Sequence, residues 1–213
     1  MNKVLILGIG PGGPDYLLPI VQKKISNADI LIGGRRALKL FPESMQTKIE
    51  IKANLAEIKD YIKANYQRLK LAVLLSGDSC FYSLLTYLRE DFSEDQLEVI
   101  PGISSMQLLF ARSGLCWQEA KFISLHGRKQ SAKLIQAVKR NQQVGVLTDR
   151  NFSPELVAEL LVAEGLGQKK IIVGENLSYP EERLIIGQAE QISKKEFAPL
   201  TVMLICGQSD YNG

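Results

Sequence analysis

Short apolar runs alternate with longer segments of helical periodicity along most of this 213-residue chain. The apolar runs are rich in Leu, Ile and Val, as in Val4-Leu5-Ile6-Leu7, and have the length of buried strands. Alternation of such runs with helices is typical of βαβ units on a mostly parallel sheet. Strands are predicted at residues 3–7, 29–32, 48–51, 71–75, 98–100, 121–125, 143–147, 170–173, 183–186 and 201–205.

The helical periodicity predicts a helix between most of these strands. The predicted helices cover residues 55–66, 81–90, 104–112, 132–140 and 154–163. Ser153-Pro154-Glu155 indicates a helix start, because serine can cap a helix and proline is tolerated at its first position. Pro14 and Pro19 are expected to interrupt the helix that would follow the first strand.

The segment from Ser113 to Trp117 breaks both periodicities and separates two series of strands and helices. It predicts an N-terminal α/β domain at residues 1–113 and a C-terminal α/β domain at 118–213, both within the usual size range. The predicted fold class is therefore α/β, with mixed, mostly parallel sheets in two domains. Because ligands often bind between domains, the active site is expected in an interdomain cleft.

Composition narrows the class of protein further. Hydrophobic residues make up 46% of the chain, which is enough for a sizeable core. Cys80, Cys116 and Cys206 are scattered and His126 is the single histidine, so neither a disulfide framework nor a zinc site is expected. The chain begins with a strand and has no apolar run of about 20 residues, so we expect a cytoplasmic protein with no membrane segment.

The net charge does not favour a nucleic-acid partner. The formal charge is +3, and lysines stand beside acidic residues on helix-like segments such as Ala56–Lys63. Such a segment is more readily explained as a solvated helix face than as a binding surface. A localised basic cleft for an acidic small molecule remains open.

Residues 8–13, Gly-Ile-Gly-Pro-Gly-Gly, match the dinucleotide fingerprint G-x-G-x-x-G. That fingerprint needs backbone N–H groups, and Pro11 removes one of them. The next apolar run ends in Gly33-Gly34-Arg35-Arg36 instead of the acidic residue that would bind a ribose. An arginine there could suit a 2′-phosphate, so an NADP-binding reductase stays as an alternative.

Polar, glycine-rich segments follow the first, fourth and fifth predicted strands, at residues 8–15, 76–83 and 101–105. In the second half, residues 125–128, 147–150 and 173–177 follow strands in the same way. The carboxyl ends of strands are where open α/β sheets bind ligands, although turn chemistry can explain any one segment. Arg150 either binds an anionic substrate or is merely solvated.

Three spaced motifs together resemble the tetrapyrrole methylases, which methylate precursors of cobalamin and sirohaem with S-adenosylmethionine. They are G-x-G-P-G-x-P at residues 8–14, S-G-D-x-x-F-Y-S at 76–83 and I-P-G-I-S-S at 100–105. The stretch I-P-G-I-S-S-M-Q-L-L-F-A-R-S-G, followed by F-I-S-L-H-G-R, is similar to the subfamily that methylates C5 of the corrin ring, at the precorrin-6Y or cobalt-precorrin-7 stage. The resemblance implies two α/β domains, an intervening cleft and a homodimer.

The resemblance also implies a set of site residues, with S-adenosylmethionine held largely by backbone groups and Asp78 shaping its loop. The implied cofactor contacts are Pro11, Gly77, Asp78, Phe81, Tyr82, Ser104, Ser105, Thr148, Asn176 and Leu177. The substrate carboxylates need cationic partners, for which the candidates are Arg35, Arg36, Arg112, Arg128 and Arg150. His126 is the candidate for moving a proton, and no metal ligands are expected.

Some larger relatives carry a second module that methylates C15 and removes a carboxylate. This chain ends soon after its last predicted strand, near Cys206-Gly207. We therefore expect C5 methylation only, with a separate C15-methyltransferase/decarboxylase polypeptide. The alternatives are a methylase of the same fold acting on ribosomal RNA or a diphthamide precursor, which needs a large basic or protein-docking surface, and a non-catalytic cofactor-binding module.

Overall fold

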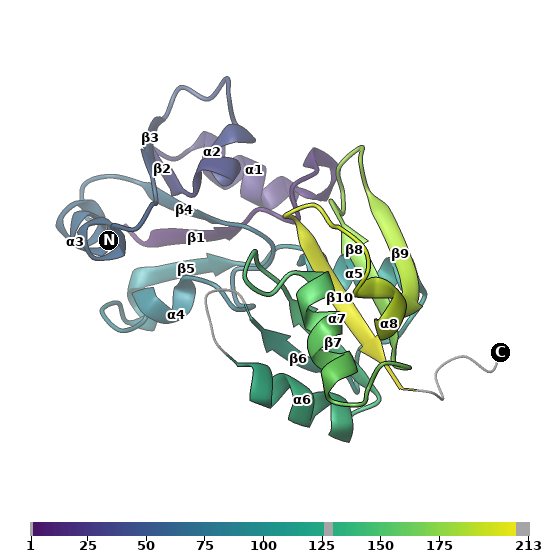
Figure 1. Ribbon diagram of the computed structural model, residues 1–213. Helices are drawn as coiled ribbons and strands as arrows, with labels where there is room; N and C mark the ends of the chain where they lie inside the picture. Colours follow the sequence, from purple (N-terminus) through teal and green to yellow (C-terminus); the bar gives the residue numbers. More distant parts are fainter. Residues whose placement is uncertain (1, 126–129, 208–213) are drawn as a thin grey trace. The chain divides into compact units, whose positions relative to one another are not determined.

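The computed structural model describes residues 2–125 and 130–207 and divides the chain into two compact α/β units, Met1–Ser104 and Ser105–Gly213 (Figure 1). The helix expected at 104–112 is α5 (Ser105–Ser113), which belongs to the second unit. It packs against three strands of the second sheet, β7 (Gln143–Leu147), β8 (Lys170–Glu175) and β10 (Thr201–Cys206). The boundary between the units in the sequence therefore lies between residues 104 and 105. The periodicity had indicated the later segment Ser113–Trp117.

The first unit contains a fully parallel five-stranded sheet in the order β3-β2-β4-β1-β5. Its strands are β1 (Val4–Gly8), β2 (Ile30–Gly33), β3 (Thr47–Glu50), β4 (Leu71–Leu75) and β5 (Leu97–Ile100). β2 and β4 are buried along their whole length, as expected for strands covered on both faces. All five lie within about one residue of the predicted runs.

Helices cover both faces of this first sheet (Figure 1). α3 (Leu55–Asn65) and α4 (Leu85–Leu88) pack on one face through apolar residues such as Ile62 and Leu88. α1 (Pro19–Ser26) and α2 (Arg35–Lys39) pack on the other, where Val21 is fully buried. Two short 3₁₀ helices, η1 (Pro14–Tyr16) and η2 (Glu94–Gln96), complete the unit.

The helix that would follow β1 is interrupted at its two prolines, as expected, and two short helices take its place. Pro14 opens η1 and Pro19 opens α1. Proline fits there because its fixed φ suits the first helical turn and its missing N–H has no partner at that position. The helix expected at 81–90 shrinks to α4, because residues 79–84 form an irregular loop.

The second unit contains a five-stranded mixed sheet in the order β6-β7-β10-β8-β9, with β6 (Lys121–Ser124) and β9 (Arg183–Gln188) at its edges. Only β6 and β7 pair in parallel, and the other three pairs are antiparallel. α6 (Ser131–Arg140), α7 (Pro154–Ala163) and α8 (Ala189–Ile192) share one apolar cluster with the sheet. α5 covers the other face, where a Cβ on Gly145 would lie 2.8 Å from the sulfur of Met106.

The start of α7 agrees with the sequence in one respect and differs in another. Pro154 is the first helical residue, as predicted. Ser153 has the backbone of a capping residue, but its buried hydroxyl finds no hydrogen-bond partner among the described residues. Within residues 2–125 and 130–207, every helix is too short or too polar to cross a membrane.

Candidate functional site

Two glycine loops join at the carboxyl edge of the first sheet, one after β1 and one after β4. Gly10 and Gly77 exchange backbone hydrogen bonds, with N–O distances of 3.2 Å from Gly10 N to Gly77 O and 2.7 Å in the other direction. Their φ angles are +77° and +73°, a conformation that glycine adopts without steric cost. These two loops therefore form one continuous backbone surface.

The loop after β5 interlocks with the same surface through Gly8 and Gly102. A Cβ on Gly8 would lie 2.5 Å from Gly102 N, and a Cβ on Gly102 would lie 2.6 Å from the carbonyl carbon of Gly8 and nearer still to Gly77 O. The obstacles are backbone atoms, which cannot move aside. At Gly77 a Cβ would meet only Ser104 Cα at 3.5 Å, so this position requires glycine for its φ and not for space.

Asp78 fastens the second loop to the third. Its Oδ1 accepts a hydrogen bond from Cys80 N at 2.8 Å, and its Oδ2 accepts one from Gly102 N at 3.0 Å. The buried hydroxyl of the next residue, Ser79, donates to Ile100 O at 2.8 Å. The Asp78 carboxylate thus orders backbone, in keeping with the expectation that it shapes the loop.

The second loop also carries two aromatic residues, Phe81 and Tyr82, and one of them has an unusual backbone conformation. The rings of Phe81 and Tyr82 stand edge to face with centroids 4.9 Å apart. Tyr82 has a φ of +50°, which is rare for a bulky residue, and its side chain is 45% exposed. Pro11 and Ser104, also predicted contacts, are buried in the first and third loops, and Ser105 is the first residue of α5.

The predicted contacts of the second unit share one edge of its sheet. β7 and β8 both run antiparallel to β10, so their carboxyl ends lie beside Thr201. Thr148, after β7, donates its hydroxyl to Thr201 O at 2.6 Å. Asn176, after β8, has a φ of +50°, and the Leu177 side chain is 5% exposed against Gly174. The side chain of Leu177 therefore belongs to the core of the second unit.

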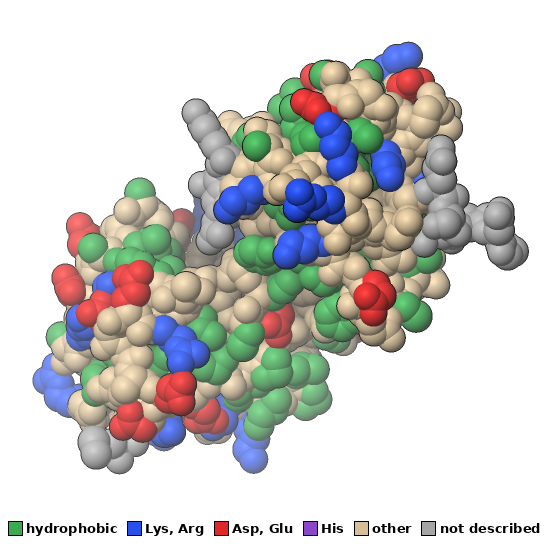
Figure 2. Space-filling view, turned by 90° about the horizontal axis from the view of Figure 1, so that it is seen from below, with side chains coloured by type: hydrophobic (Ala, Val, Ile, Leu, Met, Phe, Trp, Pro, Cys, Tyr) green, Lys and Arg blue, Asp and Glu red, His purple; other side chains and the backbone are tan. Residues whose placement is uncertain are grey.

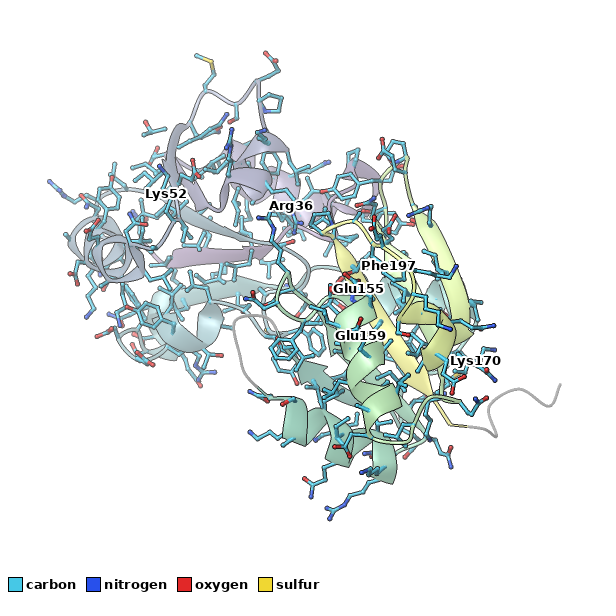
Figure 3. All side chains as sticks on the ribbon, in the orientation of Figure 1. Arg36, Lys52, Glu155, Glu159, Lys170 and Phe197 are labelled. Carbon is cyan, nitrogen blue, oxygen red and sulfur yellow. The ribbon has the colours of Figure 1, made fainter. Side chains whose placement is uncertain are left out.

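The candidate substrate arginines have different surroundings. Arg35 and Arg36 are exposed at the start of α2, and Arg36 Nη2 donates to Ser76 Oγ at 2.8 Å, at the start of the second loop (Figure 3). Arg112 instead pairs with Glu182, with Nε–Oε1 at 2.5 Å. Arg150 is exposed after β7. Arg128 and the candidate proton carrier His126 lie outside the described residues.

Glu175, the last residue of β8, and Glu182, in the β8–β9 connection, were not predicted as site residues. Glu175, 2% exposed, accepts hydrogen bonds from Arg183 Nε at 2.8 Å and from Ala198 N at 2.9 Å. Glu182 accepts one from Ser178 N at 2.7 Å. The hydrogen bond from Arg112 lowers the pKa of Glu182 below its usual value. The only sequence signal was two acidic residues around a turn, which is equally typical of a solvated loop.

No group of metal-binding side chains occurs in the part of the chain that the structure describes. The features present are two sets of strand-end loops rich in backbone groups, which suit a small organic ligand more than an ion.

The fold and the loops define a class that comparison with known proteins identifies. Residues 3–193 match the Tetrapyrrole (Corrin/Porphyrin) Methylases, and the chain therefore belongs to this family, as its motifs predicted. The precorrin-6Y methylase of Archaeoglobus fulgidus has the same fold, with a TM-score of 0.74 at 24% identity, covering 96% of this chain and 97% of that one. A uroporphyrin-III C-methyl transferase of Thermus thermophilus, complexed with S-adenyl homocysteine, gives a TM-score of 0.74 at 20% identity, with 96% and 92% covered. The predicted α/β fold class is confirmed.

Two relatives in sequence have names that specify a reaction. A Methanocaldococcus jannaschii protein named "Probable cobalt-precorrin-7 C(5)-methyltransferase" is 34% identical over 211 residues, which cover 97% of this chain and 99% of that protein. The precorrin-6Y C(5,15)-methyltransferase [decarboxylating] of a Sinorhizobium species is 28% identical over 94% of this chain, but only 48% of its own length is matched.

Proposed function

We propose that this methylase transfers the methyl group of S-adenosylmethionine to C5 of a corrin-ring intermediate of cobalamin biosynthesis, cobalt-precorrin-7 or precorrin-6Y. The observation that carries the proposal is the end-to-end similarity to the M. jannaschii protein, at 34% identity. The partial match to the C(5,15) enzyme supports a division of labour, in which a separate polypeptide methylates C15 and removes the carboxylate.

The loops of the first unit suit S-adenosylmethionine better than a dinucleotide. S-adenosylmethionine has no phosphate, so the N–H that Pro11 lacks is not needed. The loops offer fixed backbone groups, because Gly8, Gly77 and Gly102 are interlocked. We propose the contacts predicted from the motifs, namely Pro11, Gly77, Asp78, Phe81, Tyr82, Ser104, Ser105, Thr148, Asn176 and Leu177.

The chemistry that the protein must supply is mainly alignment. The methyl group of a sulfonium is already activated, so C5 attacks the methyl carbon and the C–S bond breaks as the C–C bond forms. Bound S-adenosylmethionine would supply the methyl group and leave as S-adenosylhomocysteine, whose sulfur would keep the electrons of the broken bond. Rigid loops that hold donor and acceptor in line account for rate enhancement by proximity and orientation. His126 remains our candidate for moving the ring proton.

Among the arginines, Arg36 is best placed to bind a substrate carboxylate. Its guanidinium adjoins the second glycine loop through Ser76, and its planar fork can bind a carboxylate with two hydrogen bonds. Arg35, Arg128 and Arg150 remain proposed contacts. Arg112 is a weaker candidate, because its guanidinium already binds Glu182.

The decisive experiment incubates the purified protein with cobalt-precorrin-7 and S-adenosylmethionine and measures the product by mass spectrometry. We expect one added methyl group, at C5 by NMR. Binding of S-adenosylhomocysteine without methylation of either corrinoid contradicts this proposal and favours a methylase with another substrate or a non-catalytic module. Stabilisation by NADPH but not by S-adenosylhomocysteine in a thermal-shift assay favours the reductase; a ligand at 100 times its Kd stabilises by about 2.7 kcal/mol.

We also propose that the protein is a cytoplasmic homodimer. Leu184 and Ile186 are 38% and 52% exposed on β9, an edge strand that carries an unusual amount of apolar surface. Cys80, Cys116 and Cys206 are free thiols, which suits a reducing compartment. Light scattering after size-exclusion chromatography measures the mass, and a monomer at micromolar concentration contradicts the dimer.

A further inference from the structure

The connection after β8 is strained. Among the described residues, three other than glycine have a positive φ: Tyr82 at +50°, Asn176 at +50° and Ser178 at +74°. All three lie in loops that follow strand ends, and two of them lie in this one connection. Such strain persists only where surrounding contacts impose it, and it clusters at ligand sites.

Three hydrogen bonds impose the strained conformation from opposite sides. Asn176 N donates to Leu200 O at 2.8 Å, and Tyr179 N donates to Asn176 O at 3.0 Å, which fixes the first half of the turn. Ser178 N donates to Glu182 Oε2 at 2.7 Å, which fixes the residue with the largest positive φ of the three. Glu182 is therefore the side chain that holds the second half.

Glu182 is itself held by α5. Its other oxygen, Oε1, accepts from Arg112 Nε at 2.5 Å, and Arg112 lies in the last turn of that helix. Arg112 Nη2 also reaches the second oxygen, Oε2, at 3.5 Å, so the carboxylate bridges the guanidinium and the strained backbone at Ser178 N. Arg112 and Glu182 are 42% and 22% exposed, and a pair so exposed contributes little stability by itself. The main effect of the Arg112–Glu182 pair is therefore to hold the loop in its conformation, and its contribution to the stability of the fold is small.

We infer that Glu182 is a positioning residue for the methyl donor: together with Arg112 it holds the backbone of Asn176, Leu177 and Ser178 in the conformation that binds S-adenosylmethionine. The inference rests on the proposed function, since it assigns a role toward the same ligand. It also reassigns Arg112, from a contact of the substrate carboxylates to a support of the loop.

The test compares Glu182→Gln with the double variant Glu182→Gln, Ser178→Gly. Calorimetry gives the Kd of S-adenosylhomocysteine, and steady-state kinetics give the KM of each substrate. Glu182→Gln removes the charge that strengthens the hydrogen bond from Ser178 N. The Kd of S-adenosylhomocysteine should therefore rise about tenfold, while the KM of cobalt-precorrin-7 stays near its wild-type value. Glycine adopts a positive φ without cost, so Ser178→Gly should restore most of the lost affinity.

Glu164→Gln is the matched control. Glu164 is in the same unit, pairs with Lys139 at 2.8 Å and is 43% exposed, and it lies on neither strained loop. It should leave the Kd of S-adenosylhomocysteine unchanged. A melting temperature for each variant shows whether a change in affinity accompanies a general loss of stability.

The inference is overturned if Glu182→Gln binds S-adenosylhomocysteine as the wild type does, or if its lost affinity is not restored by Ser178→Gly. Should Glu182→Gln fail to fold, Arg112→Gln provides the second test, because it leaves the acceptor of Ser178 N in place. Arg112→Gln should weaken binding in the same direction by a smaller factor, and unchanged binding overturns the inference. Failure of the wild type to bind S-adenosylhomocysteine contradicts the proposed function instead.

Discussion

At the scale of single residues, the glycine loops of the candidate site are backbone segments that a few side chains and glycines hold in place. Asp78 uses both carboxylate oxygens on backbone N–H groups, and Gly8 and Gly102 allow two loops to touch. Asp78 and the two glycines can therefore shape the loops without contacting a ligand through their own side chains. Substitutions at these positions should therefore change binding through the loop that they shape.

Asp78→Asn should weaken S-adenosylhomocysteine binding by about tenfold, because an amide offers one acceptor where the carboxylate offers two and loses the charge that strengthens both bonds. Calorimetry measures the change. Asp95→Asn is the control, since Asp95 accepts from Ser93 Oγ on exposed η2, away from the glycine loops. Equal affinity of Asp78→Asn and wild type would show that the loop does not depend on this carboxylate.

Gly102→Ala should destabilise the protein by about 2 kcal/mol or more, because the new methyl group overlaps backbone atoms of Gly8 and Gly77. Urea unfolding gives the free energy. Gly34→Ala is the matched control, since a Cβ there meets nothing within 4 Å and the φ of −64° suits alanine. If both variants unfold at the same urea concentration, the interlocking of the loops is not as tight as the distances indicate.

At the scale of elements, the sequence predicted the strands well and the short helices poorly. The ten predicted strands all occur among the described residues, because most of them are runs of branched apolar residues. α1, α2 and α8 were missed because α2 and α8 have only five and four residues, and because the start signal of Pro19 was interpreted as a break. A pattern with a period of 3.6 residues needs more turns than these to be visible.

The site residues stay predictions, whereas the places of their loops in the fold could be read from the sequence. The rule that ligands bind at carboxyl ends of strands located the loops, and the motifs supplied their residues. Glu175 and Glu182 were not predicted as site residues, because the sequence does not distinguish a glutamate that accepts a backbone N–H from one that is solvated. The pairing of Arg112 with Glu182 could not be predicted, because the two residues are 70 positions apart and come together only in three dimensions.

Ion pairs between α3 and the segment after α4 predict how the stability of the protein depends on pH. Asp91 forms ion pairs with Lys59 and Lys63 of α3, and the hydrogen bond from Lys59 in particular lowers the pKa of Asp91. A lowered pKa stabilises the fold above the unfolded value near 3.8, and this contribution disappears as the pH falls through the lower folded value. Asp91→Asn should therefore lower the melting temperature at pH 7 and flatten its decline below about pH 4.

Thermal unfolding followed by circular dichroism from pH 2 to 7 measures both effects. Asp60→Asn is the control, since Asp60 also lies on α3. An Asp91→Asn variant that loses stability on acidification as steeply as the wild type would show that these ion pairs do not contribute to the pH dependence.

At the scale of the whole molecule, surface charge and family membership favour a small acidic substrate. The net charge is only +3. On the face in Figure 2, acidic and basic side chains are interspersed over one part, and several Lys and Arg side chains lie close together over another. A net charge this small suits a small acidic substrate better than ribosomal RNA, which calls for an extended positive surface.

The interlocked glycines also affect how the first unit folds. Gly8, Gly77 and Gly102 are far apart in the chain, so their contacts close only after β1, β4 and β5 have all paired. Contacts between such distant residues form slowly and belong to one cooperative step. The three loops should therefore open together, and hydrogen exchange should give the amides of Gly10, Gly77 and Gly102 the same free energy of opening.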